Sequence, residues 1–176
     1  MAASSEDPSM QREMRRVLPF GDPPPAEAHP KIAELIRHVH GLAPAHGMLP
    51  GRQHFDPIRV PKLLPHLWLV DVVQDDARRY RVRLVGGGLI DAGTPLRQGK
   101  FLSDITADPE TGAFHELFDR ILAAKHIDWR RGPSVVPHMK YVSGLERVLV
   151  PLATDGQTVD MLMGMTLFFW QDGRVY

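Results

Sequence analysis

The chain has 176 residues, 21 Lys and Arg against 21 Asp and Glu, and no cysteine. This length suits one domain with a sizeable core, and the balanced, dispersed charge gives no electrostatic footprint for nucleic acid or an anionic membrane. Disulfides, thiolate metal sites and cysteine nucleophiles are excluded. No apolar run approaches the roughly 18 residues of a membrane span, and the polar start lacks a signal-peptide pattern. We therefore expect a soluble cytoplasmic protein that binds neither nucleic acid nor membrane.

Residues 1–28 are predicted to form a mobile tail, because they contain the triplet Pro23-Pro24-Pro25 and few bulky apolar groups. Order is expected to begin at Pro30, which suits the first turn of a helix. Four apolar residues then recur at helical spacing and predict an amphipathic helix over Pro30–Leu42. They are Ile32, Leu35, Ile36 and Val39. This helix could cover the sheet of its own chain or pair with its copy in a second subunit.

The rest of the chain is predicted to contain five strands and one long helix. Alternating or continuous apolar runs predict the strands, and an apolar stripe at helical spacing predicts the helix. The strands are Leu67–Val73, Tyr80–Val85, Gly132–Val142, Glu146–Leu152 and Val159–Trp170, and the helix is Pro109–Lys125. The order of these elements predicts an α+β fold. We divide the chain into the tail 1–28, a helical and loop segment 29–66, a sheet domain 67–171 and a short tail 172–176.

Four segments in this order resemble one known family. They are the stretch from Leu49-Pro50 to Pro65, Tyr80–Gly86, Gly99–Ile105, and Glu146-Arg147 through Asp155-Gly156. Together they are similar to the standalone bacterial PAS-like proteins, a family of unknown function, over about residues 28–168. The resemblance implies a five-stranded antiparallel sheet with helices on one face, an N-terminal flanking helix, and a sensory or regulatory role.

No catalytic or metal-binding pattern is complete in the sequence. Gly86-Gly87-Gly88 lacks the offsets of a phosphate-binding loop and is interpreted as a backbone turn. His115, Glu116 and Asp119 mimic a zinc-protease helix, but the apolar stripe of this helix leaves them pointing outward, with Glu116 and Arg120 as an ordinary ion pair. We predict no catalytic residue, no metal and no cofactor. Without a thiol, a cysteine-based photocycle is excluded, and the protein is expected to be colourless.

A modest pocket is predicted between the sheet and its helices. Met161, Met163 and Met165 share one strand face, which suits either an adaptable pocket wall or a plain sheet core. An arginine that faces the core would need a carboxylate partner, for which Glu146 and Asp71 are candidates, or an anionic ligand. The candidate ligand-binding residues are Arg83, Phe101, Phe114, Phe118, Leu122, Trp129, His138, Tyr141, Arg147 and Met163.

The leading functional hypothesis is a non-enzymatic PAS-type sensory or regulatory domain, which binds a small molecule or a protein partner in bacterial signalling. The alternatives are a ligand-free protein-interaction scaffold and a small enzyme on a PAS-like scaffold. Strands Leu67–Val73 and Val159–Trp170 are apolar on both faces, whereas one helix group covers only one face. We therefore predict a homodimer that forms through Pro30–Leu42 and an exposed sheet face.

Overall fold

The computed structural model describes residues 12–73, 79–105, 110–134, 139 and 141–176, and of residues 110–113 it describes the backbone only. In these parts of the chain, six strands form one antiparallel sheet in the order β1-β4-β5-β6-β2-β3. The α+β class and the antiparallel sheet were predicted correctly, but the sheet has six strands rather than five, and helices lie on both of its faces rather than on one. The strands are β1 (Met14–Leu18), β2 (Leu67–Val72), β3 (Tyr80–Val85), β4 (Ile127–Gly132), β5 (Val142–Leu152) and β6 (Met161–Trp170).

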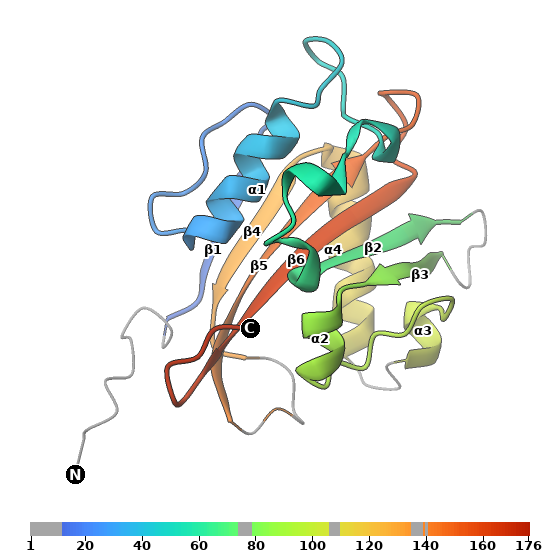
Figure 1. The fold of residues 1–176 in the computed structure, drawn as a ribbon. Coiled ribbons are helices and arrows are strands. Elements are labelled where there is room, and N and C mark those ends of the chain that lie inside the picture. The colour runs from blue at the N-terminus through green and yellow to red at the C-terminus, as the bar shows by residue number, and fades with distance from the viewer. Residues whose placement is uncertain (1–11, 74–78, 106–109, 135–138, 140) are drawn as a thin grey trace.

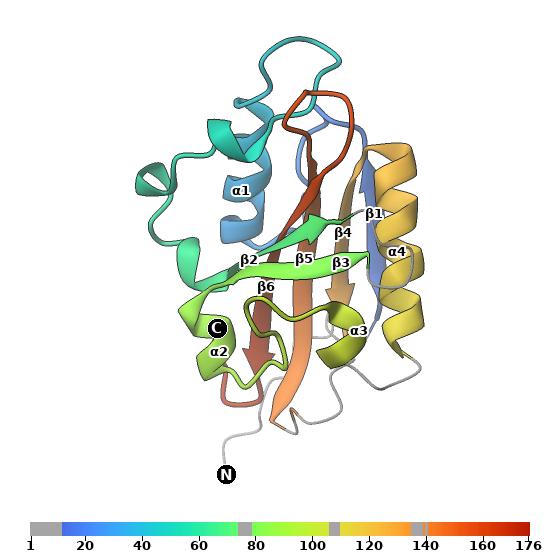
Figure 2. The same ribbon diagram turned by 90° about the vertical axis from the view of Figure 1, so that its right-hand side faces the viewer.

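Helices cover both faces of this sheet, so that it lies between two layers (Figures 1 and 2). Helix α1 (Pro30–His40) packs on one face, which we call the α1 face. The short helices α2 (Gly87–Asp91) and α3 (Leu102–Ile105) and the long helix α4 (Glu110–Ala124) contribute to the core on the other, the α4 face. Three 3₁₀ turns, η2 (Arg52–His54), η3 (Pro57–Arg59) and η4 (Leu64–His66), link α1 to β2.

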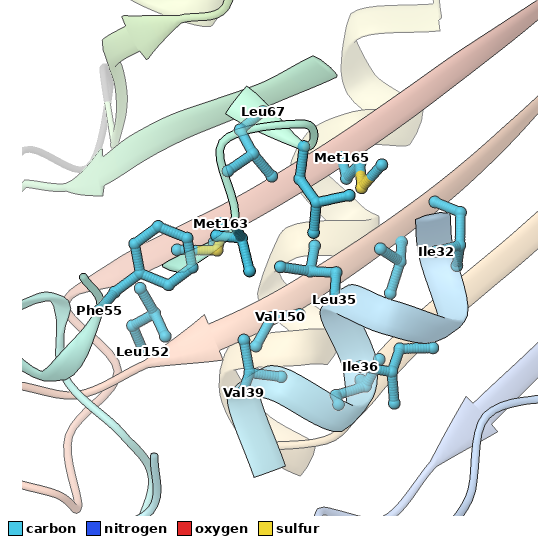
Figure 3. Packing of buried hydrophobic residues seen from close by; sticks show 14 of the residues in the cluster. Ile32, Leu35, Ile36, Val39, Phe55, Leu67, Val150, Leu152, Met163 and Met165 are labelled. Atoms are coloured by element: carbon cyan, nitrogen blue, oxygen red, sulfur yellow. The ribbon is translucent and has the colours of Figure 1, made fainter. Parts of the chain in front are cut away.

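The α1 face is the face that carries the methionines of β6. Met161, Met163 and Met165 are buried together with four fully buried side chains of α1 (Figure 3). These four are Ile32, Leu35, Ile36 and Val39, the stripe that the sequence predicted. The helix therefore covers the sheet of its own chain, and the argument that this face needs a second subunit does not hold. The homodimer stays a prediction without that support.

The α4 face has a core in which aromatic rings meet between helix and sheet. Phe118 contacts the rings of Trp68 and Tyr80, with centroids 6.2 Å and 5.0 Å away. Helix α4 ends where Lys125 adopts a positive φ of 56° and its N–H bonds to the carbonyl of Ile121. The predicted pair of Glu116 and Arg120 is present on the outer side, with 4.0 Å between the charged atoms.

Two parts of the secondary-structure prediction were wrong. Met14–Leu18 was assigned to a mobile tail, but it forms β1 at the edge of the sheet, where it pairs with β4. Its two arginines, Arg15 and Arg16, hid a strand in which Leu18 is the only buried residue. The strand expected at Gly132–Val142 is instead β4 at Ile127–Gly132, and β5 begins at Val142 rather than at Glu146. Both faces of β4 are covered, and a strand of that kind is usually apolar throughout. Because charged residues alternate with apolar ones in β4, it was not recognised.

Gly164 is required where the indole of Trp68 crosses β6. A Cβ atom at this position would lie 2.0 Å from Cε2 of Trp68. We expect Gly164→Ala to displace the indole and lower the free energy of unfolding by about 1–3 kcal/mol, measured by urea titration. Gly87→Ala is the matched control, because its added Cβ meets nothing within 4 Å. Equal stability of the two variants would contradict this account.

Candidate functional site

The candidate site is built around two successive residues of β5, a strand in the middle of the sheet. Side chains alternate along a strand, so Glu146 points to the α1 face and Arg147 to the α4 face. Glu146 is 0% exposed and Arg147 is 8% exposed. Burying either charge is costly unless other groups compensate it. The partners of these two residues therefore decide what each face can do.

On the α1 face, Glu146 holds the residue that precedes α1. Its Oε1 accepts hydrogen bonds from the backbone N–H of His29 at 2.9 Å and from Nε1 of Trp129 at 2.8 Å. Its Oε2 lies 3.9 Å from a guanidinium nitrogen of Arg131. Burial raises the pKa of Glu146 above its ordinary value, against the opposing effect of these donors. The start of α1 is thus tied to the central strand by a buried carboxylate.

A second polar contact joins α1 to the sheet through η4. Nζ of Lys31 lies 2.8 Å from Nε2 of His66, which is 5% exposed. Because the lysine donates, the imidazole accepts and is neutral. Burial, together with the charge of Lys31, lowers the pKa of His66 to about 4. The imidazole therefore stays uncharged at neutral pH.

On the α4 face, three arginines stand side by side across three strands. Arg15 of β1 is paired with Arg130 of β4, and Arg130 is paired with Arg147 of β5. We call these residues the arginine row. Like charges directly opposite each other repel, so this arrangement is unfavourable unless anions lie nearby. Among the described residues, the carboxylates close to the row are Asp128 and Glu13.

These two carboxylates compensate the row unevenly. Asp128 is 2% exposed and accepts hydrogen bonds from Arg15, whose Nε lies 2.8 Å from Oδ2. Glu13 is bonded to Nε of Arg130 at 3.0 Å, but its side chain is 59% exposed, so solvent screens its charge. Only Asp128 is therefore a fully effective counter-charge inside the protein.

Arg147 is the least satisfied member of the row. Its guanidinium comes within 3.8 Å of Oδ1 of Asp128, too far for a hydrogen bond, and lies over the ring of Phe114 at 5.3 Å. Within the described residues, two buried donors have no hydrogen-bond partner: Nε of Arg147 and Nη1 of Arg130. Burial lowers the pKa of Arg147 to about 10, so it stays charged at neutral pH. The α4 face thus presents a buried positive charge beside an aromatic ring.

The predicted site residues do not form a single cluster. Phe114, Phe118, Leu122 and Arg147 share the α4 face, whereas Trp129 and Met163 belong to the core on the α1 face. The sheet separates the two groups, so they cannot line one pocket.

The other predicted site residues lie apart from both groups. The side chain of Arg83 is 55% exposed and pairs with Asp71 at 3.3 Å, the structural partner considered from the sequence. Tyr141 is 69% exposed, and half-buried Phe101 bridges to Arg81 at the edge of β3. His138 lies outside the described residues.

Sequence reasoning missed Arg15, Asp128 and Arg130 as members of the site. The partner of Arg147 is Asp128, and Glu146 cannot be its partner because it points to the opposite face. One signal was available: residues 127–131 alternate as Ile, Asp, Trp, Arg, Arg, which is typical of a strand with a polar row on one side. The partner strand β1 and its register gave no comparable signal.

No known family model matches this chain, and no curated protein matches it by sequence. Among solved structures, one similar chain is titled "Structure of an RNA-binding Light-Oxygen-Voltage Receptor", with 12% identity and a TM-score of 0.46. The match covers 92% of this chain and 40% of that chain, so this chain spans less than half of that protein's length. In the described part of the present chain, no helix is long and apolar enough to cross a membrane, and no three His, Cys, Asp or Glu residues gather as metal ligands.

Loss of the Glu146 carboxylate is expected to loosen α1. Glu146→Ala leaves two buried donors unsatisfied, on His29 and Trp129, and should lower the free energy of unfolding by about 3 kcal/mol. Glu146→Gln keeps an oxygen for both donors and should stay within about 1 kcal/mol of the wild type. Urea unfolding at neutral pH measures both values. If the two variants were equally stable, these hydrogen bonds would not be what holds α1.

Acidification is expected to destabilise the protein through His66. The folded-state pKa is about 4 and the ordinary value is 6.5, so the unfolded chain takes up the proton first. The stability contribution present above pH 6.5 is therefore lost as the pH falls toward 4. His29 and His40, whose pKa values are also lowered by burial, act in the same direction, whereas Glu146 with its raised pKa favours the folded state on acidification.

His66→Gln isolates this effect, because it keeps an acceptor for Lys31 and removes the titration. Between pH 6.5 and pH 4, the unfolding free energy of His66→Gln should fall less than that of the wild type, by a difference of up to about 3 kcal/mol. Chemical unfolding at a series of pH values gives the slope. His46→Gln, at an exposed histidine, is the control. An unchanged slope in His66→Gln would show that this imidazole does not set the acid response.

Proposed function

We propose that the protein is a non-enzymatic PAS-type sensory or regulatory domain that responds to a small molecule. The observation that carries this proposal is the pair Glu146 and Arg147 on β5. Arg147 contacts the polar cluster on the α4 face, and Glu146, the residue before it, holds the start of α1. A shift of β5 caused by binding on the α4 face would change the hydrogen bonds that fix α1 on the opposite face.

The chemistry of the two clusters supports a binding role rather than a catalytic one. Arginines, carboxylates and aromatic rings can attract and orient a ligand, and the described residues around them include no nucleophile in hydrogen-bond contact with a general base. The chain also lacks the cysteine that a cysteinyl photocycle requires. The stimulus that we propose is therefore chemical, and the response is a change in the docking of α1.

This function is tested on the full chain, purified without denaturation. Native mass spectrometry reads the mass of any co-purified small molecule and the number of chains in the assembly, which also tests the predicted homodimer. A thermal-shift panel of metabolites then looks for saturable stabilisation, expected at about 2.7 kcal/mol when the ligand is at 100 times its Kd. A retained or saturably binding small molecule supports the proposal. Repeated absence of both would favour a ligand-free interaction scaffold.

A further inference from the structure

The arginine row is an unfavourable arrangement for the protein on its own. Arg130 and Arg147 are directly opposite each other on neighbouring strands, and their side chains are only 10% and 9% exposed. Asp128, the carboxylate buried with them, accepts a hydrogen bond at Oδ2 from Nε of Arg15, and Nη2 of Arg15 lies 2.8 Å from the same oxygen. Among the deeply buried charges of this cluster that the structure describes, two guanidiniums thus face one carboxylate, and the excess is one positive charge.

The unsatisfied atoms of the row are those that recognise carboxylates. Nε of Arg147 and Nη1 of Arg130 are buried N–H groups without an acceptor in the described structure. The guanidinium fork matches the two oxygens of a carboxylate, and such charge-assisted hydrogen bonds are stronger than neutral ones. A bound monoanion would neutralise the excess charge and accept these hydrogen bonds. The pairing with Asp128 alone achieves neither.

The surroundings of the row are apolar and aromatic. The ring of Phe114 lies against the guanidinium of Arg147, and Phe118 contacts Phe114 edge to face, with ring centroids 6.0 Å apart. Leu145 and Leu149 lie on the same face of β5, on either side of Arg147. On the neighbouring strand, Thr166 is opposite Arg147, but its hydroxyl already accepts from Nε1 of Trp68 at 3.1 Å. A ligand seated here needs an anionic end and an apolar body.

From these observations we infer that the α4 face binds a small organic carboxylate, whose carboxylate pairs with Arg147 and Arg130 and whose apolar body lies against Phe114. Inorganic phosphate fits less well, because it has no apolar part that could pack against Phe114. This inference rests on the proposed sensory function and names the chemical class of its ligand.

The test uses three acids as probes, each with its neutral amide: benzoate with benzamide, phenylacetate with phenylacetamide, and hexanoate with hexanamide. Thermal shift and calorimetry on the full chain are expected to show saturable binding of at least one acid. Its amide and inorganic phosphate should bind at least tenfold more weakly, which corresponds to about 1.4 kcal/mol. Equal binding of an acid and its amide, or of phosphate alone, would overturn the assignment.

Two substitutions test whether the acid binds at the arginine row. Arg147→Gln should weaken the best acid by about 10-fold to 100-fold, since it removes hydrogen bonds to a charged group. Arg83→Gln is the matched control, because Arg83 is an exposed arginine paired with Asp71, and its affinity should equal that of the wild type. Equal loss in both variants, or in neither, would show that the acid binds elsewhere.

Two further measurements remain decisive if Arg147→Gln does not fold. Phe114→Leu keeps every charge of the row and should weaken the acid severalfold. Hydrogen exchange on the wild type should show protection by the acid in α4 and β5, and protection confined to α1 and the 3₁₀ turns would refute the site. If native mass spectrometry finds another small molecule while all three acids fail, the carboxylate inference falls and the sensory function stands. If neither experiment finds a ligand, both fall.

Discussion

The alternation of side chains along β5 places one buried charge on each face of the sheet. Glu146 and Arg147 cannot neutralise each other, although they are neighbours in the chain, because the strand directs them apart. Each must find its compensation in other elements. The carboxylate of Glu146 is compensated by His29, the residue that precedes α1, and by Trp129, whereas the guanidinium of Arg147 is compensated by Asp128 and the ring of Phe114. Much of the polar architecture follows from this one constraint.

The buried charges on the two faces of the sheet are compensated to different degrees. On the α1 face, one oxygen of Glu146 accepts two hydrogen bonds, whereas its Oε2 has no hydrogen-bond partner among the described residues and lies 3.9 Å from Arg131. On the α4 face, the guanidiniums outnumber the buried carboxylates, and donors stay unmatched. A well-satisfied cluster fixes one arrangement, whereas an unsatisfied one is the place where an additional group changes the energy most. Unmatched buried atoms thus occur on both faces among the described residues, but the excess of buried positive charge lies on the α4 face.

Elements with a clear period were predictable, and contacts between distant elements were not. The stripe of α1 and the strand Tyr80–Val85 were found, because their apolar spacing is regular. Strand β1 was missed, because Arg15 and Arg16 interrupt a short edge strand with few buried residues. The arginine row depends on the register between β1, β4 and β5, and a single sequence does not contain that register. Arg147 was one of the candidate ligand-binding residues and is buried, but its neighbours became visible only when the strands were paired.

The N-terminal segment has a consequence for how the molecule is made. Its Arg15 pairs with Asp128 across 113 positions of sequence, and His29 reaches Glu146 across 117. During synthesis, β1 and the start of α1 leave the ribosome first but have no sheet to join until β5 has followed them. Contacts with such long sequence separation slow folding, since a large loop must close before they form. The apolar stripe of α1 therefore stays exposed through most of translation, a period in which a nascent-chain chaperone has a ready binding target.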